Sequence, residues 1–146
     1  MSPPLPILPG WWEDLEQRYA RPKRAYHTIE HVRAVLAHWE EVHAEGRWRQ
    51  PGETWVAVLL HDVIYEPGAR DNEERSALLV PSWTARFEVQ VDVGTVQALI
   101  RATASHGHNQ ASGDLALFLD CDMAILGAPP DAYDRYLHDV RQEYAG

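Results

Sequence analysis

A histidine–aspartate pair, His61–Asp62, stands at the centre of the apolar stretch "LLHDVIYE". Burying either side chain without a partner is costly, so the pair must be satisfied by something inside the fold. A divalent metal ion suits both, because a neutral imidazole nitrogen and a carboxylate oxygen are standard metal ligands. Neighbouring helix positions point about 100° apart, so a shared ion must lie between this helix and others. The pair therefore predicts further ligands on other helices.

One further candidate ligand lies in "YHTIEH", which supplies two histidines, His27 and His31. If both lie in a helix, their spacing of four residues places them on one face. If Thr28 is instead the N-cap, His27 lies outside the helix and only His31 projects from its first turn. We favour His31 as the ligand because it continues into an apolar stripe through Val35.

Another candidate lies in "LFLDCDMAIL", which carries Asp120 and Asp122. Two positions on a helix are about 200° apart, so these carboxylates face opposite ways. Asp122 falls on the apolar stripe of Leu115, Leu119 and Leu126, which predicts that it is the buried ligand. We expect Asp120 to pair with a base or to orient a ligand from behind.

Other polar residues near these motifs are candidates for substrate binding or acid–base chemistry, each with a plainer alternative. Arg24 could clamp a phosphate, or it is a surface arginine. Tyr65 could donate a hydrogen bond at the site, or it only packs. Glu73 and Glu74 in "DNEE", and His106 in "TASHGH", are candidate general acids or bases. Their alternatives are plain helix capping for the glutamates and an exposed His-rich turn for His106.

The elements that must position these residues read as helices throughout. Apolar residues recur at helical spacing between Pro/Gly breaks, and no alternating strand pattern appears. Glu53–Glu66 is about 14 unbroken residues, which favours a buried helix with His61–Asp62 at its centre, and Pro81 is expected to kink or split its own helix. The other predicted helices are Gly10–Arg21, Thr28–Ala44, Asp71–Phe87, Val91–Ser105, Ser112–Leu126 and a last one behind an Asp131 cap.

The composition agrees with one globular domain and limits its partners. The chain has 146 residues, a formal net charge of −9 and a single cysteine, Cys121. The acidic balance argues against stable nucleic-acid binding and anionic membrane surfaces. No apolar run reaches the roughly 20 residues of a membrane span, and the proline-rich start does not resemble a signal peptide. With no intramolecular disulfide, we expect a cytoplasmic protein.

The motifs, taken in order, resemble the HD-domain superfamily, whose signature is H…HD…D. His31, His61–Asp62 and Asp122 correspond to that signature. The stretches "RAYHTIEHV", "LLHDVIYEPGARDNEERSA", "LIRATASHGH" and "FLDCDMAILG" are similar to a bacterial family of predicted metal-dependent HD phosphohydrolases. The resemblance implies an all-α, single-domain HD-type bundle of about six or seven helices. We expect residues 1–10 to form an extended Pro-rich N-terminus and residues 11–146 the helical domain, shorter at its C-terminus than relatives.

The resemblance further implies a divalent metal ion (Mn, Mg, Co, Ni, Zn or Fe) held by His31, His61, Asp62 and Asp122. The expected activity is hydrolysis of a small phosphoester, with nucleotides among the candidate substrates, by metal-activated water. Asp62, His106, Glu73 and Glu74 are its candidate catalytic residues.

Two other functions stay open. Many nucleotide-cleaving HD proteins carry an acidic pair soon after His-Asp, whereas this chain has Ile64, Tyr65 and Glu66. That difference favours a metal-stabilised, non-catalytic module that binds a nucleotide or a partner. A di-iron oxygenase is the other alternative, with His27 or His106 as additional ligands. The oligomeric state is also open, a homodimer included.

Overall fold

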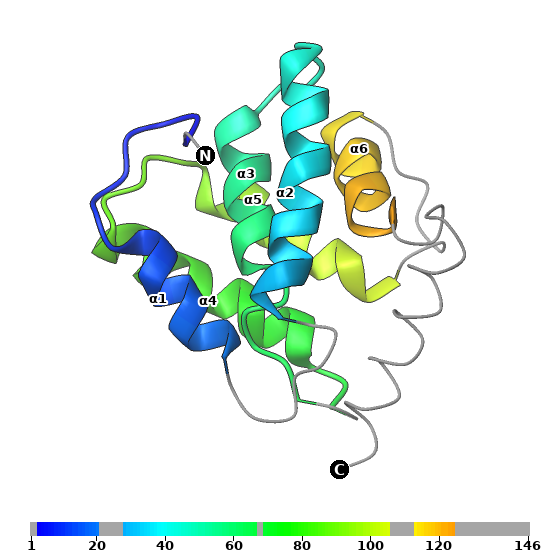
Figure 1. Cartoon of the computed structure of the whole chain (residues 1–146). Coiled ribbons are helices and arrows are strands. Elements are labelled where there is room, and N and C mark those ends of the chain that lie inside the picture. The colour runs from blue at the N-terminus through cyan, green and yellow to red at the C-terminus, as the bar shows by residue number, and fades with distance from the viewer. Residues whose placement is uncertain (1–2, 21–27, 67–68, 106–112, 125–146) are drawn as a thin grey trace.

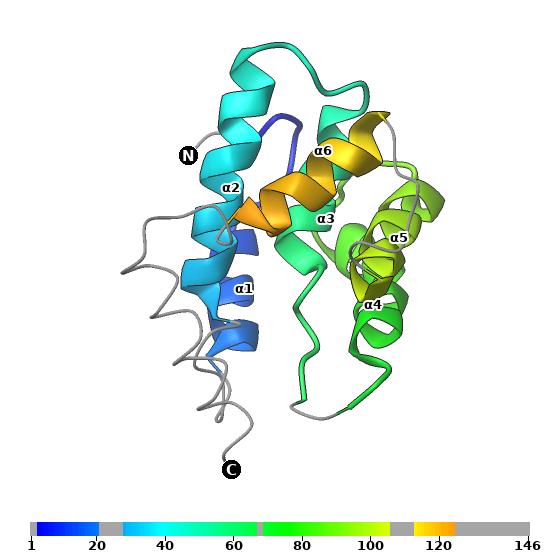
Figure 2. The same cartoon turned by 90° about the vertical axis from the view of Figure 1, so that its right-hand side faces the viewer.

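The computed structural model describes residues 3–20, 28–66, 69–105 and 113–124, and within these ranges the chain is all-helical without strands. The predicted all-α fold class is therefore confirmed. The helix expected behind Asp131 lies outside the described residues. No helix in the described ranges is long and apolar enough to cross a bilayer. The elements, drawn in Figures 1 and 2, are α1 (Trp11–Tyr19), α2 (Ile29–Ala44), α3 (Pro51–Leu60), α4 (Asn72–Arg86), α5 (Val93–Ala102), the 3₁₀ turn η1 (Thr103–Ser105) and α6 (Gly113–Asp122).

Helix α3 is the central element of the bundle. Every residue from Thr54 to Leu60 is at most 1% exposed, as expected for a helix that is apolar all round. It contacts α2, α4, α5 and α6. Figure 2 shows α6 crossing the α2–α3 pair, with α4 and α5 to one side. The end of α3 is thus enclosed by other helices, which is where a shared ligand site can form.

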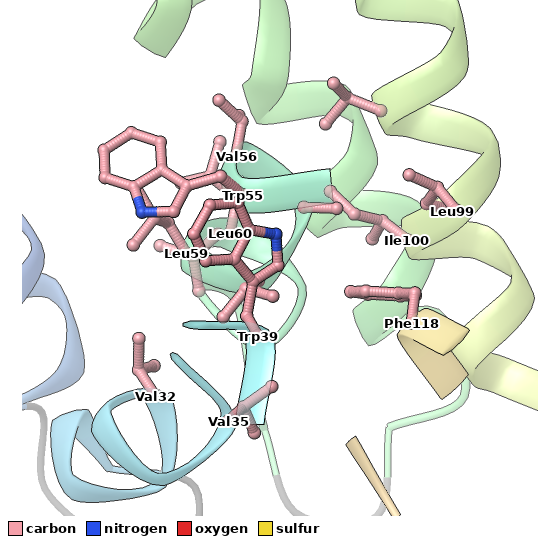
Figure 3. Packing of buried hydrophobic residues seen from close by; sticks show 14 of the residues in the cluster. Val32, Val35, Trp39, Trp55, Val56, Leu59, Leu60, Leu99, Ile100 and Phe118 are labelled. Carbon is pink, nitrogen blue, oxygen red and sulfur yellow. The ribbon is translucent and has the colours of Figure 1, made fainter. Parts of the chain in front are cut away.

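The core around α3 is built from large side chains of four helices. Figure 3 shows Trp39 of α2, Ile100 of α5 and Phe118 of α6 around α3, whose own Trp55 ring points away from Ile100 and Phe118. All four are at most 1% exposed. The indole N–H of Trp39 donates to the Thr54 hydroxyl at 2.9 Å, so this buried polar atom is satisfied.

Helix α1 is fastened to the bundle by polar side chains. The Tyr19 hydroxyl donates to the carbonyl of Leu59 on α3 at 2.8 Å. The Asp14 carboxylate accepts from the Trp83 indole and from Arg86, each at 2.9 Å, which joins α1 to α4. The non-helical segment 3–10 also lies against the bundle, through the half-buried Leu5 and Ile7.

The expected helix over Glu53–Glu66 is wrong at its C-terminal end, because α3 stops at Leu60. The amide of His61 still donates to the carbonyl of Ala57 at 2.9 Å, but that of Val63 donates to Leu60 at 3.2 Å and closes a tighter turn. Side chains of α4 then bind the backbone of residues 64 and 66 in place of helical partners. His61–Asp62 consequently lies just past the end of the helix and not at its centre.

Pro81 does not split α4, which continues from Asn72 to Arg86. Proline lacks the N–H that would bind the carbonyl of Ala77 one turn earlier. The side-chain amide of Gln97, on α5, donates to that carbonyl at 3.1 Å. A neighbouring helix therefore supplies the hydrogen bond that proline removes, and the helix continues.

Candidate metal centre

Four side chains from three separate parts of the chain converge beside the end of α3. His31 projects from the first turn of α2, His61 and Asp62 follow α3, and Asp122 is the last residue of α6. One ligand atom from each lies within 4.8 Å of the others. Thr28 is the N-cap of α2, so of the two alternatives considered the one observed is that in which His31 projects from the first turn. The four side chains form a group that could hold a metal ion.

The distances within this group fit ligands of one ion. His61 Nε2 lies 3.0 Å from Asp122 Oδ1 and 3.1 Å from Asp62 Oδ2. His31 Nε2 lies 3.2 Å and 3.5 Å from the same two oxygens. Two ligands at right angles on an ion with bonds of about 2.1 Å are about 3.0 Å apart. Each histidine nitrogen thus lies at about the spacing of an adjacent ligand from both carboxylate oxygens.

The hydrogen bond at the far side of His61 fixes how its ring faces the group. His61 Nδ1 lies 2.8 Å from the carbonyl of Val58. A carbonyl only accepts, so Nδ1 carries the hydrogen of a neutral ring and Nε2 carries the lone pair. That lone pair would face two carboxylate oxygens, which is repulsive unless a cation or a proton lies between them. Metal-bound histidines commonly donate their other N–H to a backbone carbonyl in this way.

The electrostatics of His61 also favour a cation or a proton beside Nε2. Burial alone would lower the pKa of His61, which is 1% exposed. The charges of Asp62 and Asp122 and their hydrogen bonds to the ring outweigh burial and raise the pKa well above its ordinary value. Without a metal, a proton on Nε2 satisfies both carboxylates. Nε2 therefore faces a position that demands positive charge.

The group is largely enclosed, but its carboxylates remain reachable from solvent. The side chains of His31 and His61 are 7% and 1% exposed, and those of Asp62 and Asp122 are 18% and 11% exposed. The Phe118 and His61 rings pack nearly perpendicular to each other, with centroids 6.0 Å apart. Two imidazoles and two carboxylates balance the charge of a divalent ion and leave positions free on a six-coordinate one. Such an arrangement can bind an ion and still admit a water or a substrate oxygen.

Some predicted site residues lie elsewhere in the described chain. Glu74 forms a two-pronged ion pair with Arg101 at 2.8 and 2.9 Å on the exposed surface, and hydrogen bonding to Arg101 lowers the pKa of its carboxyl. Glu73 is half-buried in the first turn of α4, outside the four-residue group. Tyr65 is half-buried in the segment after the His–Asp pair, and Asp120 is exposed on α6. Three predicted residues lie outside the described residues: Arg24, His27 and His106.

Two residues next to the group were missed in the sequence. Asn72 and Ser76 bind the backbone of residues 66 and 64, directly after the His–Asp pair. The stretch "DNEE", which contains Asn72, was interpreted as helix capping or as a source of acids and bases, and Ser76 lies just beyond it. The available signal was a pair of small polar residues four apart at the start of a helix, on the side that faces the core.

Comparison with models of protein families, with curated proteins and with solved structures finds no match. Over the described residues the chain is all-helical, and its His31, His61, Asp62 and Asp122 could hold a metal ion.

Proposed function

We propose that the chain is a metal-dependent phosphohydrolase of the HD type that cleaves a small phosphoester, with nucleotides among the candidate substrates. One observation carries the proposal: His31, His61–Asp62 and Asp122, which match the H…HD…D order in the sequence, have donor atoms within 4.8 Å of one another. The pKa of His61, which Asp62 and Asp122 raise, supports it because a positive charge is favoured beside Nε2.

In this proposal each residue has a defined role. His31 and His61 bind through Nε2, and Asp62 and Asp122 supply the two negative charges that balance a divalent ion. When bound, such an ion lowers the pKa of a water and polarises a phosphoryl oxygen. We assign to Asp62 the proton that the attacking water releases, because its side chain is more exposed than that of Asp122. The water oxygen bonds to phosphorus, the ester P–O bond breaks, and the leaving oxygen takes a proton from a general acid.

The general acid and the phosphate-binding residue are proposed outside the four ligands. Glu74 is already paired with Arg101, so Glu73 and His106 are the better general acids. Arg24 is proposed to bind the phosphate through its guanidinium, and Tyr65 to contact the substrate beside Asp62.

The test is phosphate release from a set of nucleotides and sugar phosphates. The protein is stripped with EDTA and reloaded with Mn²⁺, Co²⁺, Ni²⁺ or Mg²⁺. We expect turnover only after reloading, and a loss of about 100-fold or more in His31→Asn and Asp122→Asn. His38→Asn is the matched control, because His38 lies on the same helix with its side chain 48% exposed. It should keep wild-type turnover.

Three results would contradict the proposal, each in a different way. Turnover that survives EDTA or His31→Asn would exclude these ligands. Full metal occupancy with no turnover of any phosphoester would favour the non-catalytic binding module. Two irons per chain with oxygen-dependent oxidation would favour the di-iron oxygenase.

A further inference from the structure

The non-helical segment directly after Asp62 is held by two side chains of α4. Ser76 Oγ accepts from the amide of Ile64 at 3.0 Å and donates to the carbonyl of the same residue at 3.2 Å. The side-chain amide of Asn72 accepts from the amide of Glu66 and donates to its carbonyl, both at 3.0 Å. All four backbone groups are therefore satisfied by two side chains.

The spacing of these residues explains why one helix can serve this segment. Asn72 and Ser76 are four residues apart, and a helix rises about 6 Å over four residues. Ile64 and Glu66 are two residues apart in the non-helical segment, and their four backbone groups bind to these two side chains. One face of α4 thus presents polar side chains four residues apart to backbone groups two residues apart.

His61 and Asp62 are held by different parts of the structure. His61 is fixed by its amide to Ala57 and by its ring to Val58. Asp62 lies beyond the end of α3, and the backbone that leaves it is held by the buried Val63 and then by Ser76 at Ile64. Ser76 is 0% exposed, and losing its hydroxyl would leave the partly buried backbone groups of Ile64 without that partner.

We infer that Asn72 and Ser76 are positioning residues of the metal centre. They fix the main chain that leaves Asp62, and so hold its carboxylate in place relative to the two histidines. This inference rests on the proposed metal site. Groups that orient ligands from behind commonly change metal affinity by about 10- to 100-fold, and we expect an effect of this kind here.

The test compares two variants of α4 that each lose one buried hydroxyl. Ser76→Ala loses the hydroxyl that holds Ile64. Thr84→Val is the control, because Thr84 is 4% exposed and its hydroxyl donates to Val80 at 2.8 Å within the same helix. Each full-length protein is stripped with EDTA, and the Kd for Mn²⁺ is measured by titration calorimetry at fixed pH. Amide hydrogen exchange at Ile64 and Glu66 is followed by NMR.

Ser76→Ala is expected to raise the Mn²⁺ Kd about tenfold and to speed exchange at Ile64. Thr84→Val should leave both quantities at their wild-type values. Asn72→Ala provides a second variant, with the exchange effect centred on Glu66, and it carries the test if Ser76→Ala does not fold. A Kd that stays unchanged in the folded variants, or that rises equally in Thr84→Val, would overturn the inference while leaving the proposed function intact. A wild-type protein that binds no Mn²⁺ would overturn both, and is thus a distinct outcome.

Discussion

His61 has its two ring nitrogens in opposite surroundings. Nδ1 faces the carbonyl of Val58, and Nε2 faces the carboxylates of Asp62 and Asp122. The first contact fixes the tautomer, and the second demands a positive charge. A proton and a metal ion therefore compete for the same nitrogen, and metal affinity should fall as the pH is lowered.

This competition predicts how the metal-free protein responds to pH. Asp62 and Asp122 raise the pKa of His61 above 6.5 in the folded state, against the effect of burial. The folded state then binds a proton that the unfolded state releases at lower pH. The stabilisation is fully present below about pH 6.5 and is lost as the pH rises through the raised pKa. Urea unfolding in EDTA should thus show a free energy of unfolding that declines above pH 6.5.

The matched variants separate His61 from other titrating groups. Asp122→Asn removes one carboxylate that raises the pKa, so it should flatten the decline. His38→Asn should leave the decline as it is in the wild type, because His38 is exposed. A free energy of unfolding that rises over the same interval in the wild type would contradict this account.

At the level of residues, the apolar stripes were the most informative part of the sequence. They favoured Asp122 over Asp120, and the structure places Asp122 in the four-residue group and leaves Asp120 exposed. Asn72 and Ser76 could not be found in the same way. Their partners are backbone groups of another segment, and the pattern of side chains does not encode where that backbone passes.

At the level of elements, the presence of each helix was predicted more securely than the residue at which it ends. Predicted Asp71–Phe87 corresponds closely to α4, whereas the helix around His61 ends six residues early. Beyond the His61–Asp62 pair the chain continues with the apolar Val63 and Ile64, and Val63 is 1% exposed. An apolar run can therefore continue as a buried non-helical segment, and periodicity does not distinguish the two.

The continuity of α4 through Pro81 gives a prediction about Gln97. Gln97→Ala leaves the buried carbonyl of Ala77 without this donor and should lower the free energy of unfolding by about 1–2 kcal/mol. Pro81→Ala restores a backbone N–H that can bind the same carbonyl. In the Pro81→Ala background, Gln97→Ala should lower the free energy of unfolding by much less. Urea unfolding of the wild type, the two single variants and the double variant gives the coupling energy. An equal effect of Gln97→Ala on the free energy of unfolding in both backgrounds would contradict the explanation.

At the level of the whole molecule, the group of four joins parts of the chain that are distant in sequence. Its members come from α2, from the end of α3 and from the end of α6. An ion bound by all four would hold these elements together only in the folded state. Metal binding should therefore stabilise the entire bundle and not only the loop around Asp62.

Thermal unfolding tests this coupling. At a free Mn²⁺ concentration of 100 times Kd, the free energy of unfolding should rise by about 2.7 kcal/mol. For a chain of this size the Tm should increase by roughly 5–10 °C. His31→Asn should abolish most of the increase, while His38→Asn should retain it. An equal increase in both variants would show that Mn²⁺ stabilises the protein from another site.

The most direct test is a crystal structure of the full chain grown with Mn²⁺, with anomalous scattering used to locate the ion. The account predicts one strong peak, about 2.0–2.3 Å from Nε2 of His31 and His61 and from a carboxylate oxygen of Asp62 and Asp122. Clear density for all four side chains with no anomalous peak between them, at a Mn²⁺ concentration that saturates the protein, would contradict it.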